Sequence, residues 1–161
     1  MSPAKCLVLG FGSDALSDDG LPVRLVADLQ KIFNEESCNF ITSPVGGMEL
    51  IHLLEGYDEA ILIDTQSTSR RAPGEISEFT PAHFEETLHL SSQHDLSFEN
   101  ALHLAEVMRI RMPSQIRIFA IEISENKLLS FEFSAIIQSR YPSILSYLCR
   151  VLKNRTGKEN E

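Results

Sequence analysis

An acidic turn follows an apolar stretch near the start of the chain and holds the residues best suited to chemistry. Residues 7–12 end in Gly-Phe-Gly, as a buried strand does when it meets a ligand-binding loop, and three aspartates follow within seven residues. Asp19, the last of them, begins a predicted helix. Asp64 ends another apolar stretch, and His94 lies in a polar loop before a helix. Two carboxylates and one imidazole suit a borderline divalent cation such as nickel or zinc.

A dinucleotide site is the first alternative, because Gly10, Gly12 and Ala15 match a loose Gly-x-Gly-x-x-Ala fingerprint. Such a site also needs an acid at the end of the second strand to hold the ribose, where this chain has Ile-Thr-Ser-Pro at residues 41–44. Each carboxylate near a pyrophosphate costs about 1 kcal/mol or more. A nucleotide site is therefore disfavoured.

A phosphoacceptor domain of the receiver type is the second alternative. It requires an acidic pair directly at the end of the first strand, but here Gly10 and a loop intervene. The lysine expected after a late strand is also absent, because that strand ends in Ile121-Glu122. Both departures disfavour this class.

Each proposed metal ligand also has a simpler explanation. Asp19 can cap a helix, Asp64 can cap a turn or pair with an arginine, and His94 can be an ordinary surface histidine. The sequence contains neither a Gly-x-Ser-x-Gly elbow nor a His-Glu-x-x-His motif. Any hydrolysis would therefore need a metal to polarise a carbonyl or activate water.

The elements that must position these residues alternate between strands and helices. Apolar stretches at 5–10, 38–42, 59–64 and 115–122 are typical of buried strands, and helical spacing marks 19–34, 48–54, 97–110 and 134–152. Alternating residues at 75–79 predict an edge strand. We predict an α/β three-layer sandwich, with a mostly parallel twisted sheet of about five strands, helices on both faces and one antiparallel edge strand. Strand ends then bring Asp19 and Asp64 to one edge.

Length and composition set the class of protein. The 161 residues, 43% of them hydrophobic, predict one domain over 1–152, followed by a charged flexible tail over 153–161. No apolar stretch reaches the ~20 residues of a membrane span, and the net charge of −9 disfavours nucleic acid. We expect a cytoplasmic protein. The three cysteines form no Cys-x-x-Cys motif and are expected in the core.

The order of these motifs resembles that of the hydrogenase maturation proteases over about residues 5–152. Residues 7–13 and 16–21 are similar to the family's opening strand and acidic turn, and 46–50 to the start of its second helix. Residues 61–64 are similar to its third strand and metal-binding aspartate, 73–76 to its next loop and strand, and 92–96 to its histidine loop. Ile121-Glu122 with Glu125 resembles a late strand and acidic loop.

The resemblance implies a function and a role for each matched residue. Members of this family trim the C-terminus of the large subunit of nickel–iron hydrogenases, so the implied partner is the large-subunit precursor. Asp19, Asp64 and His94 fall on the three nickel ligands. The nickel is the substrate's own, already loaded in the precursor, and no protein nucleophile is required.

Some residues depart from the family's pattern. Ser13 stands where asparagine is usual, Pro22 and Ser97 stand where glycine is frequent, and Ser43-Pro44-Val45 replaces a Gly-Gly-Thr-like turn. That turn lies near the implied substrate cleft. A non-catalytic metal- or precursor-binding protein on the same fold is therefore the alternative function, while the intact ligand positions favour a protease.

Overall fold

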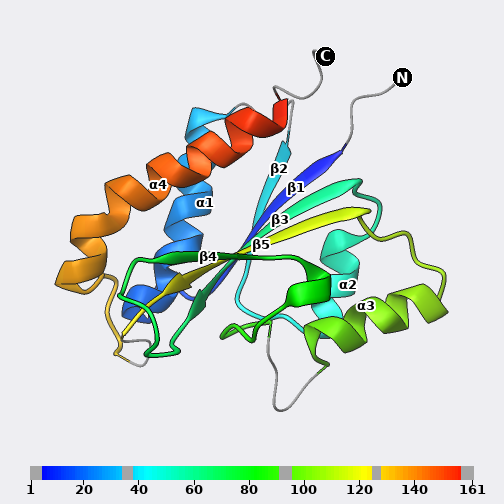
Figure 1. The fold of residues 1–161 in the computed structure, drawn as a ribbon, viewed down its shortest axis with the longest axis horizontal. Helices are drawn as coiled ribbons and strands as arrows, with labels where there is room; N and C mark the ends of the chain where they lie inside the picture. Colours follow the sequence, from blue (N-terminus) through cyan, green and yellow to red (C-terminus); the bar gives the residue numbers. More distant parts are fainter. Residues whose placement is uncertain (1–4, 34–37, 91–95, 125–127, 157–161) are drawn as a thin grey trace.

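The computed structural model describes residues 5–33, 38–90, 96–124 and 128–156, and every structural statement below refers to these residues. They form the predicted α/β architecture, one five-stranded sheet between two layers of helices (Figure 1). The strands are β1 (Cys6–Phe11), β2 (Cys38–Ser43), β3 (Glu59–Gln66), β4 (Ile76–Phe79) and β5 (Gln115–Glu122). The helices are α1 (Leu21–Ile32), α2 (Met48–Leu54), α3 (Phe98–Val107) and α4 (Ala135–Thr156), with short 3₁₀ helices η1 (Ser17–Gly20) and η2 (Pro81–His83).

The sheet has the order β2-β1-β3-β5-β4, and all neighbours are parallel except β4, which runs antiparallel to β5. The predicted antiparallel edge strand is thus confirmed. The chain moves from β1 to β2 on one side and then to β3 on the other, so the connections diverge between β1 and β3. Open α/β sheets bind ligands at the carboxyl ends of the strands beside such a switch point.

Alternate residues of the buried strands face opposite helix layers, as the two-residue period of a strand requires. Val8 and Ile63 pack in one cluster with α1 and α4, whereas Leu9 and Leu62 pack in the other with α2 and α3. Figure 1 shows these two helix pairs on opposite faces of the sheet. The near-continuous apolar strands of the sequence therefore reflect burial on both faces.

Two details of the structure differ from the sequence predictions: the end of α4 and the burial of Cys149. Helix α4 continues past the predicted end at Leu152 to Thr156, because Arg155 makes a long-range ion pair with Glu59 at 3.1 Å. Val107 and Met108 lie exposed at the end of α3. Cys6 and Cys38 are buried as expected, whereas Cys149 is only half-buried.

Asp18 does not cap the helix that follows it. No side chain caps α1, which begins with Pro22 in its first turn. Instead Asp18, fully buried, accepts hydrogen bonds from the backbone N–H and the hydroxyl of Ser134, both at 2.7 Å. Ser134 directly precedes α4, so Asp18 ties the acidic turn to the start of the last helix.

Replacing Asp18 with alanine should lower the free energy of unfolding by about 2–4 kcal/mol, because a buried donor loses its charged acceptor. The matched control is Asp18→Asn, whose amide can accept from the Ser134 N–H and donate to the hydroxyl, and which should cost only about 1 kcal/mol. Urea unfolding followed by circular dichroism measures both values. Equal losses in the two variants would show that this pair of hydrogen bonds does not dock α4.

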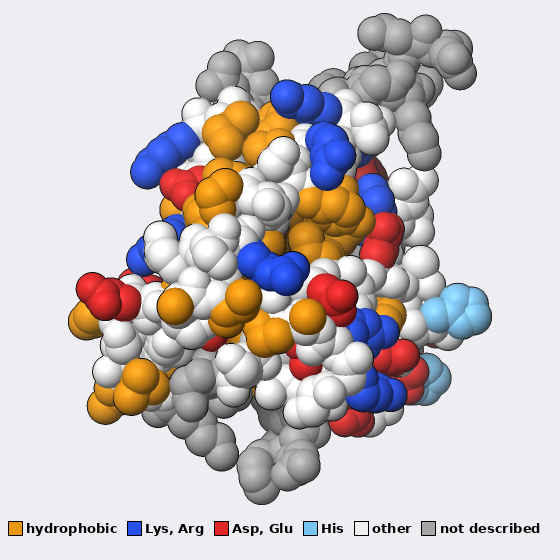
Figure 2. Space-filling model, turned by 60° about the vertical axis from the view of Figure 1, so that its left-hand side comes forward, with side chains coloured by type: hydrophobic (Ala, Val, Ile, Leu, Met, Phe, Trp, Pro, Cys, Tyr) orange, Lys and Arg blue, Asp and Glu red, His pale blue; other side chains and the backbone are white. Residues whose placement is uncertain are grey.

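The described residues contain no helix that is both long and apolar enough to cross a membrane. On the face shown in Figure 2, the Lys and Arg side chains of the described residues are scattered among acidic and apolar ones and form no continuous basic stripe.

Candidate active site

Asp19 reaches the site through the tight turn that follows β1. Its Oδ2 accepts the backbone N–H of Ser13 at 2.8 Å, and the residue is only 4% exposed. Gly12 makes this approach possible: its φ is +148°, and a Cβ built there would lie 2.0 Å from the Asp19 carbonyl oxygen. The glycine of the sequence motif therefore serves to bring a carboxylate close to the strand end.

Asp64 lies near the end of β3 and is fully buried. Its carboxylate accepts five hydrogen bonds. The donors are the backbone N–H groups of Thr65 (2.8 Å), His89 (2.9 Å) and Leu90 (3.2 Å), the hydroxyl of Thr87 (2.6 Å) and Nδ1 of the His89 ring (2.7 Å). A carboxylate held in this way is rigid and fixes the segment that donates to it.

His89 joins the two aspartates. Its Nδ1 lies 2.7 Å from Asp64 Oδ1, and its Nε2 lies 3.3 Å from Asp19 Oδ1. Burial lowers the pKa of His89, but the hydrogen bonds and charges of Asp19 and Asp64 together outweigh burial and raise the pKa to about 10. In this conformation the ring is an imidazolium bridging two carboxylates.

The segment that carries His89 packs closely against the turn before α2. A Cβ on Gly46 would lie 2.4 Å from the His89 carbonyl oxygen, so only glycine permits this approach. Ser43 shapes the same turn: its hydroxyl donates to the Val45 carbonyl at 2.8 Å, and its own carbonyl accepts the Gly12 N–H at 3.1 Å. Ser43 of the altered turn thus contacts the loop after β1, and Gly46, directly after the turn, approaches the segment that carries His89.

The structure brings Asp19 and Asp64 to the same imidazole, as expected from their positions at strand ends. His94 lies outside the described residues, so its predicted place at the site stays a prediction. His89 was the residue that sequence reasoning missed. Among the described residues, no group of three or more His, Cys, Asp or Glu side chains is arranged to hold a metal ion. The hydrogen bonds of His89 explain this, because both of its ring nitrogens already face carboxylates.

A cavity of about 530 Å³ adjoins this group on the α3 side of Thr87. Its walls combine apolar side chains with polar ones at the end of β3. Gln66 is only 1% exposed, and its Oε1 has no hydrogen-bond partner among the described residues. The lining residues are Gln66, Ser67, Thr68, Phe84, Glu86, Thr87, Leu88, Leu90, Ser97, Phe98 and Glu99.

Glu122, which the resemblance matches to the end of a late strand, organises a neighbouring loop. It is 2% exposed and accepts hydrogen bonds from the backbone N–H of Thr68 at 2.7 Å and of Ser69 at 3.0 Å. These bonds fix the chain where it leaves β3. Glu122 therefore shapes the rim of the cavity.

A comparison with known protein families identifies the family to which the chain belongs. The sequence profile of the hydrogenase maturation proteases, HycI type, matches residues 23–151. The chain belongs to the hydrogenase maturation protease family. The resemblance found in the sequence motifs is thereby confirmed over most of the chain. A comparison with curated protein sequences finds no match.

Solved structures share the fold of this family member. The hydrogenase maturating endopeptidase HybD from E. coli is 22% identical and matches with a TM-score of 0.74 over 94% of this chain and 93% of that chain. The [NiFe] hydrogenase maturation protease HycI from Thermococcus kodakarensis is 17% identical, with a TM-score of 0.66 over 93% of each chain. A hydrogenase 2 maturation peptidase from a Thaumarchaeota archaeon is 17% identical, with a TM-score of 0.64 over 92% of this chain and 98% of that chain.

Proposed function

We propose that this protein is an endopeptidase that removes a C-terminal peptide from a nickel-loaded hydrogenase large-subunit precursor and uses the nickel for recognition. The observation that carries the proposal is the convergence of Asp19 and Asp64 on one imidazole at the switch point of the sheet. Family membership supplies the reaction class and the precursor. The acidic site suits a substrate that presents a cation.

Two carboxylates and one imidazole are ligand types that suit a borderline divalent cation, although the described side chains are not arranged around one metal position. Two ligand atoms bound to one tetrahedral metal at about 2.0–2.1 Å lie roughly 3.3 Å apart. His89 Nε2 and Asp19 Oδ1 are 3.3 Å apart, which is longer than a strong ionic hydrogen bond. We infer that these two atoms face the nickel of the substrate, which would replace the Nε2 proton. His94 remains the predicted third ligand.

Asp64 then has two roles in the proposal. The sequence predicts it as a nickel ligand, and its negative charge contributes to the acidic site that attracts the cation. Through its contact at 2.7 Å with Nδ1, it also fixes the tautomer and direction of His89. Carboxylates that orient a metal-bound imidazole in this way are common partners of metal sites.

Among the described residues, no cysteine is suited to act as the nucleophile. The hydrogen bond with Cys38 and burial raise the pKa of Cys6, and burial raises that of Cys149 on α4. A thiol with a raised pKa is a poor nucleophile. When nickel is bound, it supplies a Lewis acid that polarises the scissile carbonyl. The cavity beside Thr87 has room for the substrate chain.

The decisive experiment incubates the protein with purified nickel-loaded large-subunit precursor and follows the precursor's mass. We expect the loss of a C-terminal peptide from the nickel-loaded precursor and none from the same precursor prepared without nickel. Cleavage of both forms would contradict recognition through the metal.

A non-catalytic precursor-binding protein is the second candidate, and two observations favour it. The Asp64 carboxylate is fully buried with all its hydrogen bonds made, and the turn at residues 43–45 departs from the family's pattern. Stable binding of the nickel-loaded precursor without any mass loss would support this candidate over the protease.

A further inference from the structure

At the end of β5 that lies away from the candidate site, the first residues of the strand have no β4 residue paired with them. Strand β4 covers β5 only as far as the pair Phe79 and Ile118, although β5 begins at Gln115. The first residues of β5 therefore have β3 on one side and no residue of β4 on the other. Open strand edges of this kind pair readily with an added extended chain.

Proline chemistry explains why β4 does not continue along these unpaired residues. Continuing the β4 register past Phe79 places Pro81 opposite Ile116. Proline has no backbone N–H, so it cannot donate to the Ile116 carbonyl. The chain leaves the ladder here and forms η2, which lies close to β5 without continuing the strand pairing. Among the described residues, no backbone hydrogen bond joins Ile116 to residues 80–83.

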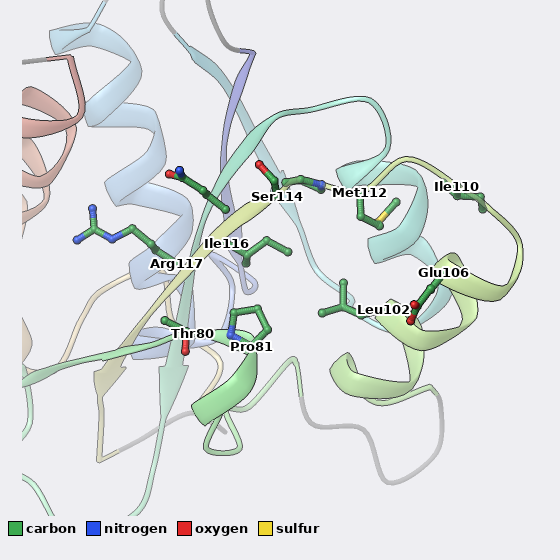
Figure 3. Close-up of a pocket in the computed structure, with 11 residues that line it drawn as sticks. Thr80, Pro81, Leu102, Glu106, Ile110, Met112, Ser114, Ile116 and Arg117 are labelled. Carbon is green, nitrogen blue, oxygen red and sulfur yellow. The ribbon is translucent and has the colours of Figure 1, made fainter. Parts of the chain in front are cut away.

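An apolar cavity of about 620 Å³ lies directly beside this open edge. Figure 3 shows Ile116, Pro81, Leu102 and Met112 around it, between β5 and the end of α3. Leu102, Ile110 and Met112 are only half-buried and pack on the same cluster as Ile116. A residue paired with Ile116 would point its side chain to this same face of the sheet, because directly opposite residues share a face.

Two charged side chains, Glu106 and Arg117, line the cavity, and they differ in whether they are paired. Glu106 lines it, is exposed, and among the described residues makes no side-chain hydrogen bond or ion pair. Arg117 also lines it, but its guanidinium is engaged with Glu78 at 2.7 Å. Of the two charged side chains that line the cavity, only Glu106 is without an ion-pair partner among the described residues, so this carboxylate can complement a basic side chain.

We propose that this groove binds an extended peptide segment of a partner protein. The peptide pairs with the first residues of β5, inserts one large aliphatic side chain into the cavity and places a Lys or Arg beside Glu106. The unpaired part of β5 can form hydrogen bonds with a peptide backbone, and the apolar walls of the cavity can bury an aliphatic side chain. The unpaired carboxylate of Glu106 can bind the basic side chain. Aliphatic and basic residues two positions apart lie on one face of an extended chain. The proposal does not depend on proteolysis.

The test titrates the ¹⁵N- and methyl-labelled protein with the probe peptide acetyl-Thr-Leu-Ser-Lys-Ser-amide and follows chemical shifts. We expect shifts at the Ile116 amide and at the Leu102 and Met112 methyl groups. Changing the peptide's leucine to alanine should weaken binding about 10-fold, because most of the buried apolar area is lost. Methylating the leucine backbone nitrogen should weaken it about 5–10-fold by removing one hydrogen bond.

Protein variants test the charge. Glu106→Lys should weaken binding of the probe about 5-fold. The matched control is Glu99→Lys, because Glu99 is also exposed on α3 and lies two turns earlier on the same stripe. It should change binding less than 2-fold. Equal binding of the N-methylated peptide, or shifts located elsewhere, would overturn the proposal. So would self-association of the protein that the peptide blocks, because a second copy would then occupy the groove.

Discussion

Replacing Asp64 with asparagine should lower the free energy of unfolding by about 3–5 kcal/mol and slow precursor processing on the order of 100-fold. Each carboxylate oxygen accepts at least two hydrogen bonds. An asparagine amide has one acceptor, so in either orientation its NH₂ group faces donors. The segment that carries His89 then loses its attachment to β3.

Urea unfolding and precursor processing measured by mass spectrometry check both parts. Thr87→Val is the matched control, because it removes one donor and keeps the carboxylate, and it should cost about 1–2 kcal/mol. An Asp64→Asn protein as stable as the parent would mean that these hydrogen bonds do not hold the segment in place.

The parallel sheet could be predicted because its strands are buried on both faces and read as continuous apolar runs. The convergence of Asp19 and Asp64 followed from topology alone, since β1 and β3 are adjacent and parallel. Family resemblance added the reaction class. None of these inferences needed the details of any side-chain contact.

His89 could not be found in the same way, because residues 80–95 hold three histidines and no clear periodicity. One local signal was present: Thr87-Leu88-His89-Leu90 alternates polar and apolar residues. Thr87 and His89 both contact Asp64, but residues 88–90 form a turn, so this alternation does not mark a strand. Choosing between His89 and His94 from the sequence required knowing where that segment meets β3.

Long-range contacts explain two further features that local sequence patterns do not indicate. Asp18 precedes a helix and has the residue type of a cap, but its partner Ser134 is distant in sequence. Residues 153–156 look like a charged tail, yet the Arg155 ion pair with Glu59 keeps them helical. Local propensity is a weak predictor where a tertiary partner is available.

Asp19→Asn should slow processing of the nickel-loaded precursor on the order of 100-fold and leave the fold intact. Asparagine keeps an acceptor for the Ser13 N–H, so unfolding should change by only about 1 kcal/mol, but the negative charge that would face the metal is lost. Calorimetric titration should show weaker binding of the nickel-loaded precursor and unchanged binding of the nickel-free form. Equal weakening of both would assign Asp19 to general contact with the precursor.

Variants of His89 and His94 distinguish a histidine that holds the two aspartates in place from one that binds the substrate's metal. His89→Ala should lose about 2 kcal/mol or more of unfolding free energy as well as activity, because it leaves two buried carboxylates without their shared cation. His94→Ala should lose processing alone if, as the sequence predicts, His94 contacts the substrate's metal. A His94→Ala protein that processes the precursor at the parent rate would remove His94 from the site. His89 would then be the imidazole that acts with Asp19 and Asp64.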